Sequence, residues 1–379
     1  MNRRLMVLLI LLLVLICGTA PDARSESKTA NIALVIALSG VAAEDNAPAV
    51  NSARLALEEI NRQGGLAGRP AALILMDNQS TPLGSKIAAQ KAAASSAVAV
   101  IGAIWSSHSL PMARILQSSG VPMITPTSSN PKVTRVGDYI FRACFNDEFQ
   151  GEVIANVACE DVGAKTAAIL RNANEEYSMT LAARFSSSFE RMGGKVLFSG
   201  TYKGEAADFT ECLQGIKEKS PDVVFIPGYG RDSGLAVKQA RNMGIDAVFL
   251  GGDGWDGEIR EYGGEALVGS MYSTHWHPDV SFPASRHLLR LYRKAYKGER
   301  VGNTSIPLTY DAIMLLADAV KRAESLDRKA VRDALAATRG FEGATGTITF
   351  DAQGDPVRKE ACIVRMDRES DRLLRTVSP

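Results

Sequence analysis

Residues 31–38 read NIALVIAL and residues 71–77 read AALILMD, and the stretch between them has a different periodicity. Both outer segments are short, continuous and apolar, which is typical of parallel strands covered by helices on both faces. Between them, apolar residues recur at the spacing of one helix face and predict a helix over residues 49–63: Val50, Ala53, Leu57 and Ile60. A strand, a helix and a second strand in this order indicate an α/β fold with a parallel sheet.

The same alternation extends along the chain in two series. The first continues with strands expected at 97–104 and 121–126 and helices near 83–95 and 107–118. The second is expected to begin with a strand at 139–144, followed by helices at 148–160, 177–192, 208–218 and 232–243 and strands at 166–172, 195–202, 222–228 and 247–252. Each series predicts one doubly wound, Rossmann-like unit.

The last third of the chain must pack on these two units. We expect a strand at 269–274, helices near 284–297, 307–324 and 327–337, and a terminal pair of strands at 345–350 and 359–366. No Gly/Ser-rich linker separates the halves. The sequence therefore predicts two interleaved lobes joined by short crossovers.

Composition limits the class of protein. The chain has 379 residues, which is typical of about two domains, with 46% apolar and 22% charged residues. These values exclude a disordered chain, a collagen and a coiled coil. A net charge of +1 and only 12 Phe, 9 Tyr and 3 Trp give no indication of nucleic-acid binding.

Residues 1–25 have the pattern of a secretory signal peptide. Arg3 and Arg4 precede an apolar run over residues 5–17, which is too short to span a bilayer, and Ala23-Arg24-Ser25 fits a cleavage site. This pattern predicts a periplasmic or extracytoplasmic protein. A lipoprotein acylated at Cys17 is the alternative, which Ile16 disfavours because a small residue is needed before that cysteine.

Four cysteines remain after the signal segment: Cys144, Cys159, Cys212 and Cys362. In an oxidising compartment they allow three complete pairings. The alternative is that they are small buried apolar residues in the reduced state. Their spacing fits no metal motif.

Ligands of open α/β sheets bind beyond the carboxyl ends of the strands. Ser106 lies there, before a predicted helix whose free N–H groups are able to receive a carboxylate; the alternative is a plain helix cap. The segment PTSSNP (126–131) offers hydroxyl and N–H groups or is an ordinary turn. Asp253 follows another strand in a Gly-rich turn, where it either pairs with a cation or caps a helix.

Enzymatic and cofactor motifs are weak or absent. Residues 252–257 match G-x-G-x-x-G, but they follow the last strand of a series rather than the first, which argues against NAD. His275 and His277 lack a third ligand nearby in sequence, so we expect no metal. No nucleophile elbow, Walker A or HExxH motif is present, and we expect no catalytic residues and no cofactor.

Several motifs resemble those of the type I periplasmic solute-binding proteins of the leucine/isoleucine/valine-binding family, which serve ABC transporters. The resemblance covers about residues 31–370 and rests on IALVIALSG (32–40), ARLALEEINRQGGLAGRP (53–70), VIGAIWSSHS (100–109), VPMITPTSSNPKVT (121–134), YIFRACFND (139–147), SPDVVFIPGYG (220–230), FLGGDGWDG (249–257) and LTYDAIMLLADA (308–319). In that family, two α/β lobes joined by three crossovers close on an amino acid in the cleft between them. The resemblance implies lobe 1 over 30–142 plus 272–350 and lobe 2 over 143–271 plus 351–379.

The resemblance also implies ligand-binding residues. Ser106 matches the serine that takes the ligand carboxylate, and Thr127 and Ser129 match positions in the hydroxyl-rich turn that hold the carboxylate and ammonium. Tyr177 and Tyr229 match the two tyrosines of lobe 2, and Asp253 stands where the family pairs an acid, often Glu, with the ammonium.

One departure concerns the ligand side chain. Leucine-type members carry an aromatic residue in the loop after the first strand, and the aligned place here falls near Asp45 in the loop 41–48. Glu44, Asp45 and Asn46 therefore predict a polar side-chain pocket and a polar or cationic amino acid. Alternatively these acids face solvent, and Trp105 and Trp255 form an aromatic wall that suits an aromatic or other small carboxylic acid.

The sequence thus predicts a monomeric, exported solute-binding protein that delivers a small ligand to a membrane permease. A ligand-sensing receptor lobe on the same fold is one alternative, but the mature chain lacks a second apolar span. An enzyme on a doubly wound fold is the other alternative, which a turnover assay would separate from binding.

Overall fold

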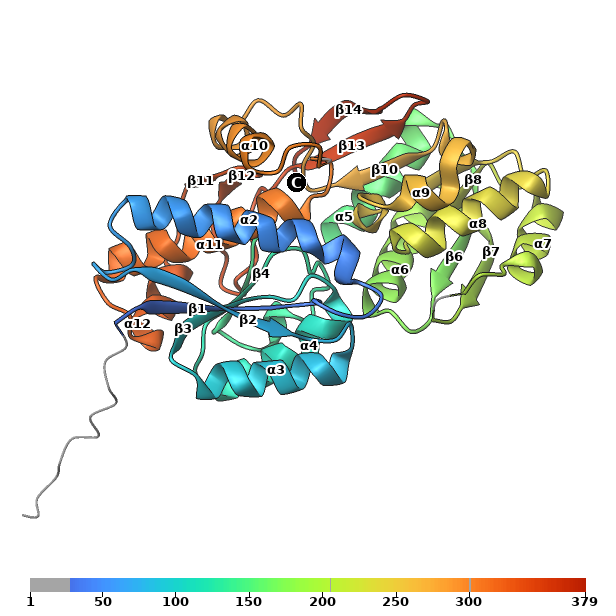
Figure 1. Cartoon of the computed structure of the whole chain (residues 1–379). Helices are drawn as coiled ribbons and strands as arrows, with labels where there is room; N and C mark the ends of the chain where they lie inside the picture. The colour runs from blue at the N-terminus through green and yellow to red at the C-terminus, as the bar shows by residue number, and fades with distance from the viewer. Residues whose placement is uncertain (1–27, 205, 300) are drawn as a thin grey trace, which may run out of the picture.

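The computed structural model describes residues 28–204, 206–299 and 301–379. The expected signal peptide and Cys17 lie outside this range. The described residues form two α/β lobes that lie side by side (Figure 1). None of the helices in the described part of the chain has the length and apolar character needed to cross a membrane.

Lobe 1 is built on a parallel sheet of five strands in the order β2-β1-β3-β4-β5. The strands are β1 (Ala30–Ile36), β2 (Ala71–Asp77), β3 (Ala97–Gly102), β4 (Met123–Thr125) and β5 (Ile140–Arg142). One face packs on α3 (Pro82–Ala94) and α4 (Ser106–Ser118). The other face packs on α2 (Ala43–Arg62), α10 (Pro283–Ala295), α11 (Ser305–Ala323) and α12 (Arg328–Ala336). A hairpin of β11 (Phe341–Gly343) and β12 (Gly346–Ile348) completes this lobe.

Lobe 2 has seven strands in the order β14-β13-β10-β9-β8-β6-β7. The parallel strands are β6 (Thr166–Asn172), β7 (Lys195–Tyr202), β8 (Val223–Phe225), β9 (Val248–Gly251) and β10 (Met271–Thr274). Strands β13 (Ala361–Met366) and β14 (Asp371–Val377) extend the sheet in antiparallel fashion. The helices α5 (Asp147–Asn156) and α6 (Glu176–Arg191) cover one face, and α7 (Thr210–Lys219), α8 (Gly230–Asn242) and α9 (Ile259–Gly263) cover the other.

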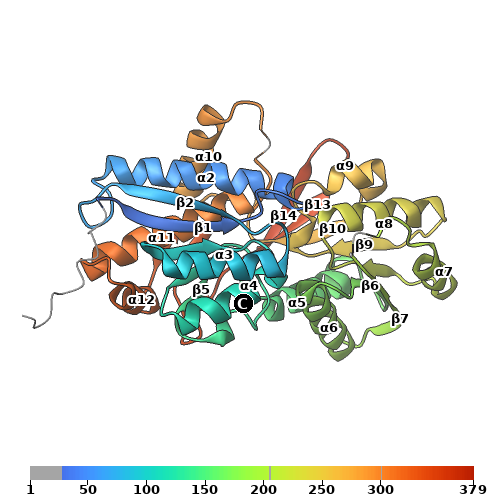
Figure 2. The ribbon, with the colours of Figure 1, turned by 60° about the horizontal axis from the view of Figure 1, so that its bottom comes forward.

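Chain connectivity confirms the predicted interleaving of two doubly wound lobes. The chain crosses between lobes after β5, after β10 and between β12 and β13, which gives three crossovers. The carboxyl ends of the parallel strands in both lobes face the junction, so the loops that follow them meet there. Figure 2 shows α4 next to α5 and α6 at this junction.

Several predicted elements need correction. The strand at 139–144 does not start the second series, because β5 pairs with β4 at the edge of the first sheet. The segment at 345–350 does not pair with 359–366, because β12 pairs with β11 and β13 pairs with β10 and β14. Strand β14 was not predicted. The lobe boundary at 271/272 falls inside β10, which belongs wholly to the sheet of lobe 2.

The loop predicted at 41–48 is largely helical. Helix α2 begins at Ala43, six residues before the predicted start, and includes Pro48. Its first turn holds Glu44 and Asp45, where acidic side chains interact favourably with the helix dipole. Asp45 is therefore positioned by a rigid helix rather than by a flexible loop.

Candidate functional site

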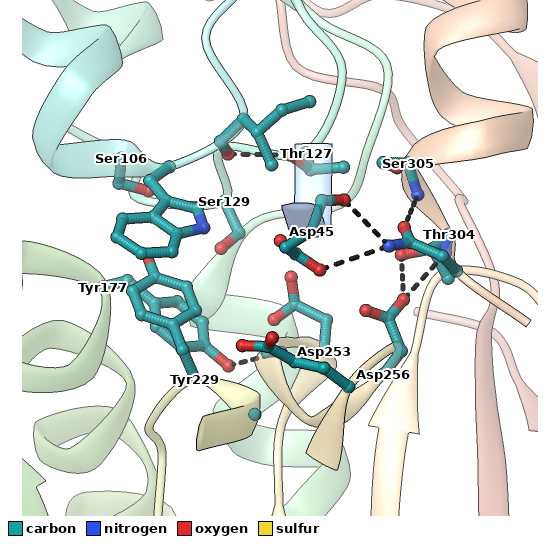
Figure 3. Close-up of a pocket in the computed structure, with 16 residues that line it drawn as sticks. Asp45, Ser106, Thr127, Ser129, Tyr177, Tyr229, Asp253, Asp256, Thr304 and Ser305 are labelled. Carbon is teal, nitrogen blue, oxygen red and sulfur yellow. Dashed lines mark hydrogen bonds between the residues drawn. The ribbon is translucent and has the colours of Figure 1, made fainter. Parts of the chain in front are cut away.

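A cavity lies between the two lobes, at the carboxyl ends of their strands (Figure 3). Its lining includes eight of the residues that the sequence singled out: Asp45, Trp105, Ser106, Thr127, Ser129, Tyr177, Tyr229 and Asp253. These residues come from six different strand–helix junctions. The fold thus gathers them into one site, as expected for ligands of open α/β sheets.

Ser106 is the first residue of α4, and it is almost fully buried. Its Oγ accepts a hydrogen bond from the backbone N–H of Asn130 at 3.2 Å, which ties the helix start to the hydroxyl-rich turn. The N-terminus of a helix carries a partial positive charge and N–H groups without helical partners. This end of the cavity is therefore suited to an anion such as a carboxylate.

The side chain of Arg142 holds the turn at 126–131 in place. This side chain is fully buried, and its guanidinium donates to the carbonyl oxygens of Ser128 at 2.7 Å and Asn130 at 2.9 Å. It also forms an ion pair of 2.6 Å with Asp355, from the segment before β13. The Thr127 hydroxyl donates to the carbonyl of Ile104 at 2.7 Å. The turn is thus an ordered platform rather than a mobile loop.

Asp253 enters the cavity from the Gly-rich turn after β9. Its Oδ2 lies 3.0 Å from Nε2 of His275, whereas its buried Oδ1 has no hydrogen-bond partner. The glycines of this turn permit close packing, because a Cβ on Gly252 would lie 2.5 Å from the Tyr177 hydroxyl oxygen. That hydroxyl accepts a hydrogen bond from the N–H of Gly254 at 3.1 Å. The G-x-G-x-x-G pattern therefore serves to bring Tyr177 and Asp253 together.

Aromatic rings form one wall of the cavity. Trp105 of lobe 1 stacks on Tyr229 of lobe 2 with centroids 4.2 Å apart, and Tyr229 in turn lies 5.4 Å from Tyr177. Burial raises the pKa of both tyrosine hydroxyls well above the usual value. The two hydroxyls are therefore neutral at physiological pH and able to donate hydrogen bonds.

A family model described as periplasmic binding protein matches residues 29–371. The chain belongs to the periplasmic binding protein family. The leucine-, isoleucine-, valine-, threonine- and alanine-binding protein of Pseudomonas aeruginosa is 30% identical over 330 residues, covering 86% of this chain and 87% of that protein.

Two solved structures show the same architecture. A leucine-binding protein from Thermotoga maritima has a TM-score of 0.88 at 32% identity and covers 93% of this chain and 99% of that one. A branched-chain amino acid transporter substrate-binding protein from Streptococcus pneumoniae, solved in complex with isoleucine, has a TM-score of 0.85 at 29% identity and covers 93% and 100%. The homologues of this periplasmic binding protein are solute-binding proteins rather than enzymes, in agreement with the sequence-based expectation.

Two predicted pocket residues lie elsewhere in this binding protein. Trp255 is fully buried in the core of lobe 2, where it packs on Gly251 and its Nε1 donates to the carbonyl of Ile226 at 2.8 Å. The absence of a side chain at Gly251 leaves room for the indole inside the lobe rather than in the cavity. Glu44 is exposed and lines a groove outside the cavity.

Five polar lining residues were not predicted: Asp256, Glu258, Asn303, Thr304 and Ser305. Asp256 of lobe 2 accepts hydrogen bonds from the N–H, at 2.8 Å, and the hydroxyl of Thr304, at the start of α11 in lobe 1. Asn303 donates to Oδ1 of Asp45 at 3.2 Å. A polar residue before the helix predicted at 307–324 is an N-cap signal that would have indicated Thr304 and Ser305.

The carboxyl groups of the cavity have strongly altered acidities. Burial raises the pKa of Asp45 to about 6 and that of Asp256 to about 8. Burial, together with the charge of Asp45, raises the pKa of Glu258 to about 7. Ionisation of each acid at this buried position costs free energy.

The four cysteines are unpaired in the structure. Cys144 and Cys362 are buried, while Cys159 and Cys212 are partly exposed. The first two agree with the alternative of small buried apolar residues, whereas Cys159 and Cys212 do not.

Proposed function

We propose that this protein is the extracytoplasmic substrate-binding component of an ABC importer and that it binds an amino acid zwitterion between its lobes. The observation that carries this proposal is the opposed polarity of the two sides of one cavity between the lobes. A helix N-terminus and hydroxyl groups lie on one side, and Asp253 presents a buried, unpartnered carboxylate oxygen on the other.

Each end of a zwitterion has a candidate partner. The carboxylate is assigned to Ser106, the first turn of α4 and the Thr127–Ser129 turn. The ammonium is assigned to Asp253, with the Tyr177 hydroxyl beside it. A charge taken out of water is tolerated when it is paired and hydrogen-bonded, so a ligand with both groups satisfies the site better than one with either group alone.

Binding is coupled to closure of the lobes. Ser106 and Thr127 belong to lobe 1, whereas Tyr177, Tyr229 and Asp253 belong to lobe 2. A ligand held by both sets has higher affinity for the closed arrangement and shifts the population towards it. The corresponding partner is a membrane permease that recognises the closed form. We propose that the protein is monomeric. Its lobe 1 comprises residues 30–142 plus 275–350, and its lobe 2 comprises residues 143–274 plus 351–379.

The names of the relatives favour a branched-chain amino acid. The acids that line the cavity favour a ligand with a polar or cationic side chain. The aromatic wall of Trp105 and Tyr229 favours the second candidate, which is an aromatic or other small carboxylic acid.

A thermal-shift screen of the mature protein tests the proposal. It compares the common amino acids with aromatic acids and small dicarboxylates in the wild type and in Asp253→Asn. A ligand at 100 times Kd stabilises the folded state by about 2.7 kcal/mol. We expect a shift with an amino acid that Asp253→Asn reduces strongly. A shift only with acids that lack an amine would replace the amino-acid assignment by the carboxylic-acid alternative. A protein that responds to neither class would contradict both.

A further inference from the structure

The charge of the cavity is unbalanced. Among the described residues that line it there are four carboxylates and no Lys or Arg: Asp45, Asp253, Asp256 and Glu258. A zwitterion supplies one ammonium, which Asp253 is proposed to bind. Three acids then remain for the part of the ligand beyond its α-carbon.

The hydrogen-bond partners of the remaining acids are mostly neutral. Asp45 accepts from the amides of Asn303 and Asn46, and Asp256 accepts from the N–H and hydroxyl of Thr304. Arg231 is the cation whose charge stabilises ionised Glu258, but it contributes less than the opposing effects of burial and of Asp45. Within the described part of the chain, Arg231 therefore offsets the charge of Glu258 only in part, and no Lys or Arg lines the cavity beside these acids.

The acids also face one another across the junction. Asp45 belongs to lobe 1, and Asp256 and Glu258 belong to lobe 2. Figure 3 shows the carboxyl groups of Asp45, Asp253 and Asp256 directed towards a shared space, on the side away from Tyr177 and Tyr229. Like charges brought together by closure repel, and a cation between them removes the repulsion.

The outer groove continues this charge pattern. It shares Asp45, Glu258 and Asn303 with the cavity. Among the residues that the structure describes, its lining contains eight acids and one Arg or Lys, Arg260, which is itself hydrogen-bonded to Asp371. A groove lined by one sign of charge raises the local concentration of ions of the opposite sign. The groove that adjoins the cavity thus favours cations.

The cavity also has unused hydrogen-bonding capacity at its acidic side. Ser305 is 3% exposed and lines the cavity, and its Oγ has no hydrogen-bond partner. Buried polar groups are usually paired, so the unpaired hydroxyl of this lining residue indicates that a polar ligand group belongs in this part of the cavity.

We propose that the ligand is a basic amino acid whose side-chain cation, an ammonium or a guanidinium, lies between Asp45, Asp256 and Glu258. This inference rests on the proposed function, because the α-carboxylate and α-ammonium keep the partners assigned above. The basic side chain supplies the charge that lets the acids of the two lobes approach.

Isothermal titration of the mature protein with matched ligand pairs tests this. L-Arginine is compared with L-citrulline, and L-lysine with L-norleucine, because each pair differs chiefly in the side-chain charge. We expect at least one basic ligand to bind 100-fold or more tightly than its neutral counterpart. Norleucine, leucine or isoleucine binding as tightly as lysine and arginine would overturn the basic-ligand inference and leave the proposed function in place.

Two further outcomes separate the proposals. No binding of any amino acid would overturn the proposed function and the inference together. Cadaverine and agmatine carry the cations of lysine and arginine but no carboxylate. If they bind more tightly than lysine and arginine, the cation site is retained but the assignment of an amino acid as its ligand is overturned.

Two isosteric variants locate the cation. Glu258→Gln and Asp45→Asn should each weaken binding of the basic ligand at least tenfold and change binding of its neutral counterpart less than twofold. Asp246→Asn, which removes a fully exposed acid of lobe 2, is the control for the change in net charge and should alter neither. Equal losses for the charged and neutral ligands, or no loss at all, would contradict the assigned position of the cation.

Discussion

Trp105 of lobe 1 stacks on Tyr229 of lobe 2 with ring centroids 4.2 Å apart and an angle of 9° between the planes. The two residues come from different lobes, since one precedes α4 and the other precedes α8. The stack is therefore a direct contact between the lobes at the edge of the cavity.

Replacement of Trp105 should weaken ligand binding, because the contact between the two lobes is lost. Aromatic pairs contribute about 0.5–1.5 kcal/mol beyond their buried area, so Trp105→Ala is expected to raise Kd by roughly two- to twelvefold, as measured by titration calorimetry. Trp105→Phe retains a ring and should lose less. An unchanged Kd in Trp105→Ala would show that the stack does not stabilise the liganded form.

The same residue should report closure by fluorescence. The chain has three Trp, of which Trp255 and Trp276 are buried in one hydrophobic cluster and Trp105 lies between the lobes. We expect the ligand-induced change of tryptophan fluorescence to disappear in Trp105→Phe while binding persists by calorimetry. A change of full size in that variant would assign the signal to the two buried tryptophans.

Arg142 should be essential for both stability and the hydroxyl-rich turn. Its buried guanidinium joins the carbonyls of Ser128 and Asn130 to Asp355. Removal of one partner of a buried ion pair costs about 3–5 kcal/mol, so Arg142→Met should lower the free energy of unfolding by that amount in urea. Arg142→Lys should restore only part of it, because an ammonium cannot reproduce the planar set of donors. A loss below 1 kcal/mol would contradict this role.

Gly252→Ala should disturb the site through packing alone. The added methyl group would lie 2.5 Å from the Tyr177 hydroxyl oxygen and 2.7 Å from Leu181, so both side chains must shift. Overpacking costs about 1–3 kcal/mol, and we expect a lower thermal midpoint together with weaker ligand binding. Gly302→Ala is the matched control for stability, because its Cβ would meet no atom within 4 Å. Equal midpoints for the two variants would contradict the packing role of Gly252.

The sequence was sufficient to locate most of the candidate site because of the geometry of parallel sheets. Ser106, Thr127, Tyr229 and Asp253 each follow a short apolar strand, and the carboxyl ends of such strands share one edge. The pattern placed them near one another without any knowledge of the contacts. The pattern did not reveal which residues of one lobe contact residues of the other.

The features that were missed depend on contacts between distant segments. Asp256 meets Thr304, 48 residues later, and Asn303 meets Asp45, 258 residues earlier. Trp255 was expected in the cavity because no local pattern shows that Gly251 opens space for it in the core. Strand β14 was missed because its exposure alternates at the edge of a sheet, which gives a weaker signal than a buried run.

The acids of the cavity should make the stability of the ligand-free protein depend on pH. Their pKa values in the folded state are raised by burial to about 6 for Asp45, 7 for Glu258 and 8 for Asp256. A raised pKa means that the folded state binds the proton more tightly than the unfolded state. The contribution of these groups is therefore fully present below about pH 4 and is lost as pH rises through 6 to 8. Glu44, Glu261 and Asp253 strengthen this effect, whereas Arg231 opposes it.

A difference measurement isolates this contribution from the other titrating groups. We expect the thermal midpoint of ligand-free Asp256→Asn to rise relative to that of the wild type as pH is increased from 5 to 8.5, because the variant has no carboxyl to ionise at the junction. Asp246→Asn, which alters an exposed acid, should keep a constant difference over the same range. A saturating basic ligand should reduce the pH dependence of the wild type, since its cation stabilises the ionised acids. If the difference in thermal midpoint between Asp256→Asn and the wild type stays constant between pH 5 and 8.5, Asp256 is already ionised at pH 5. Burial of Asp256 would then not be the source of the pH dependence.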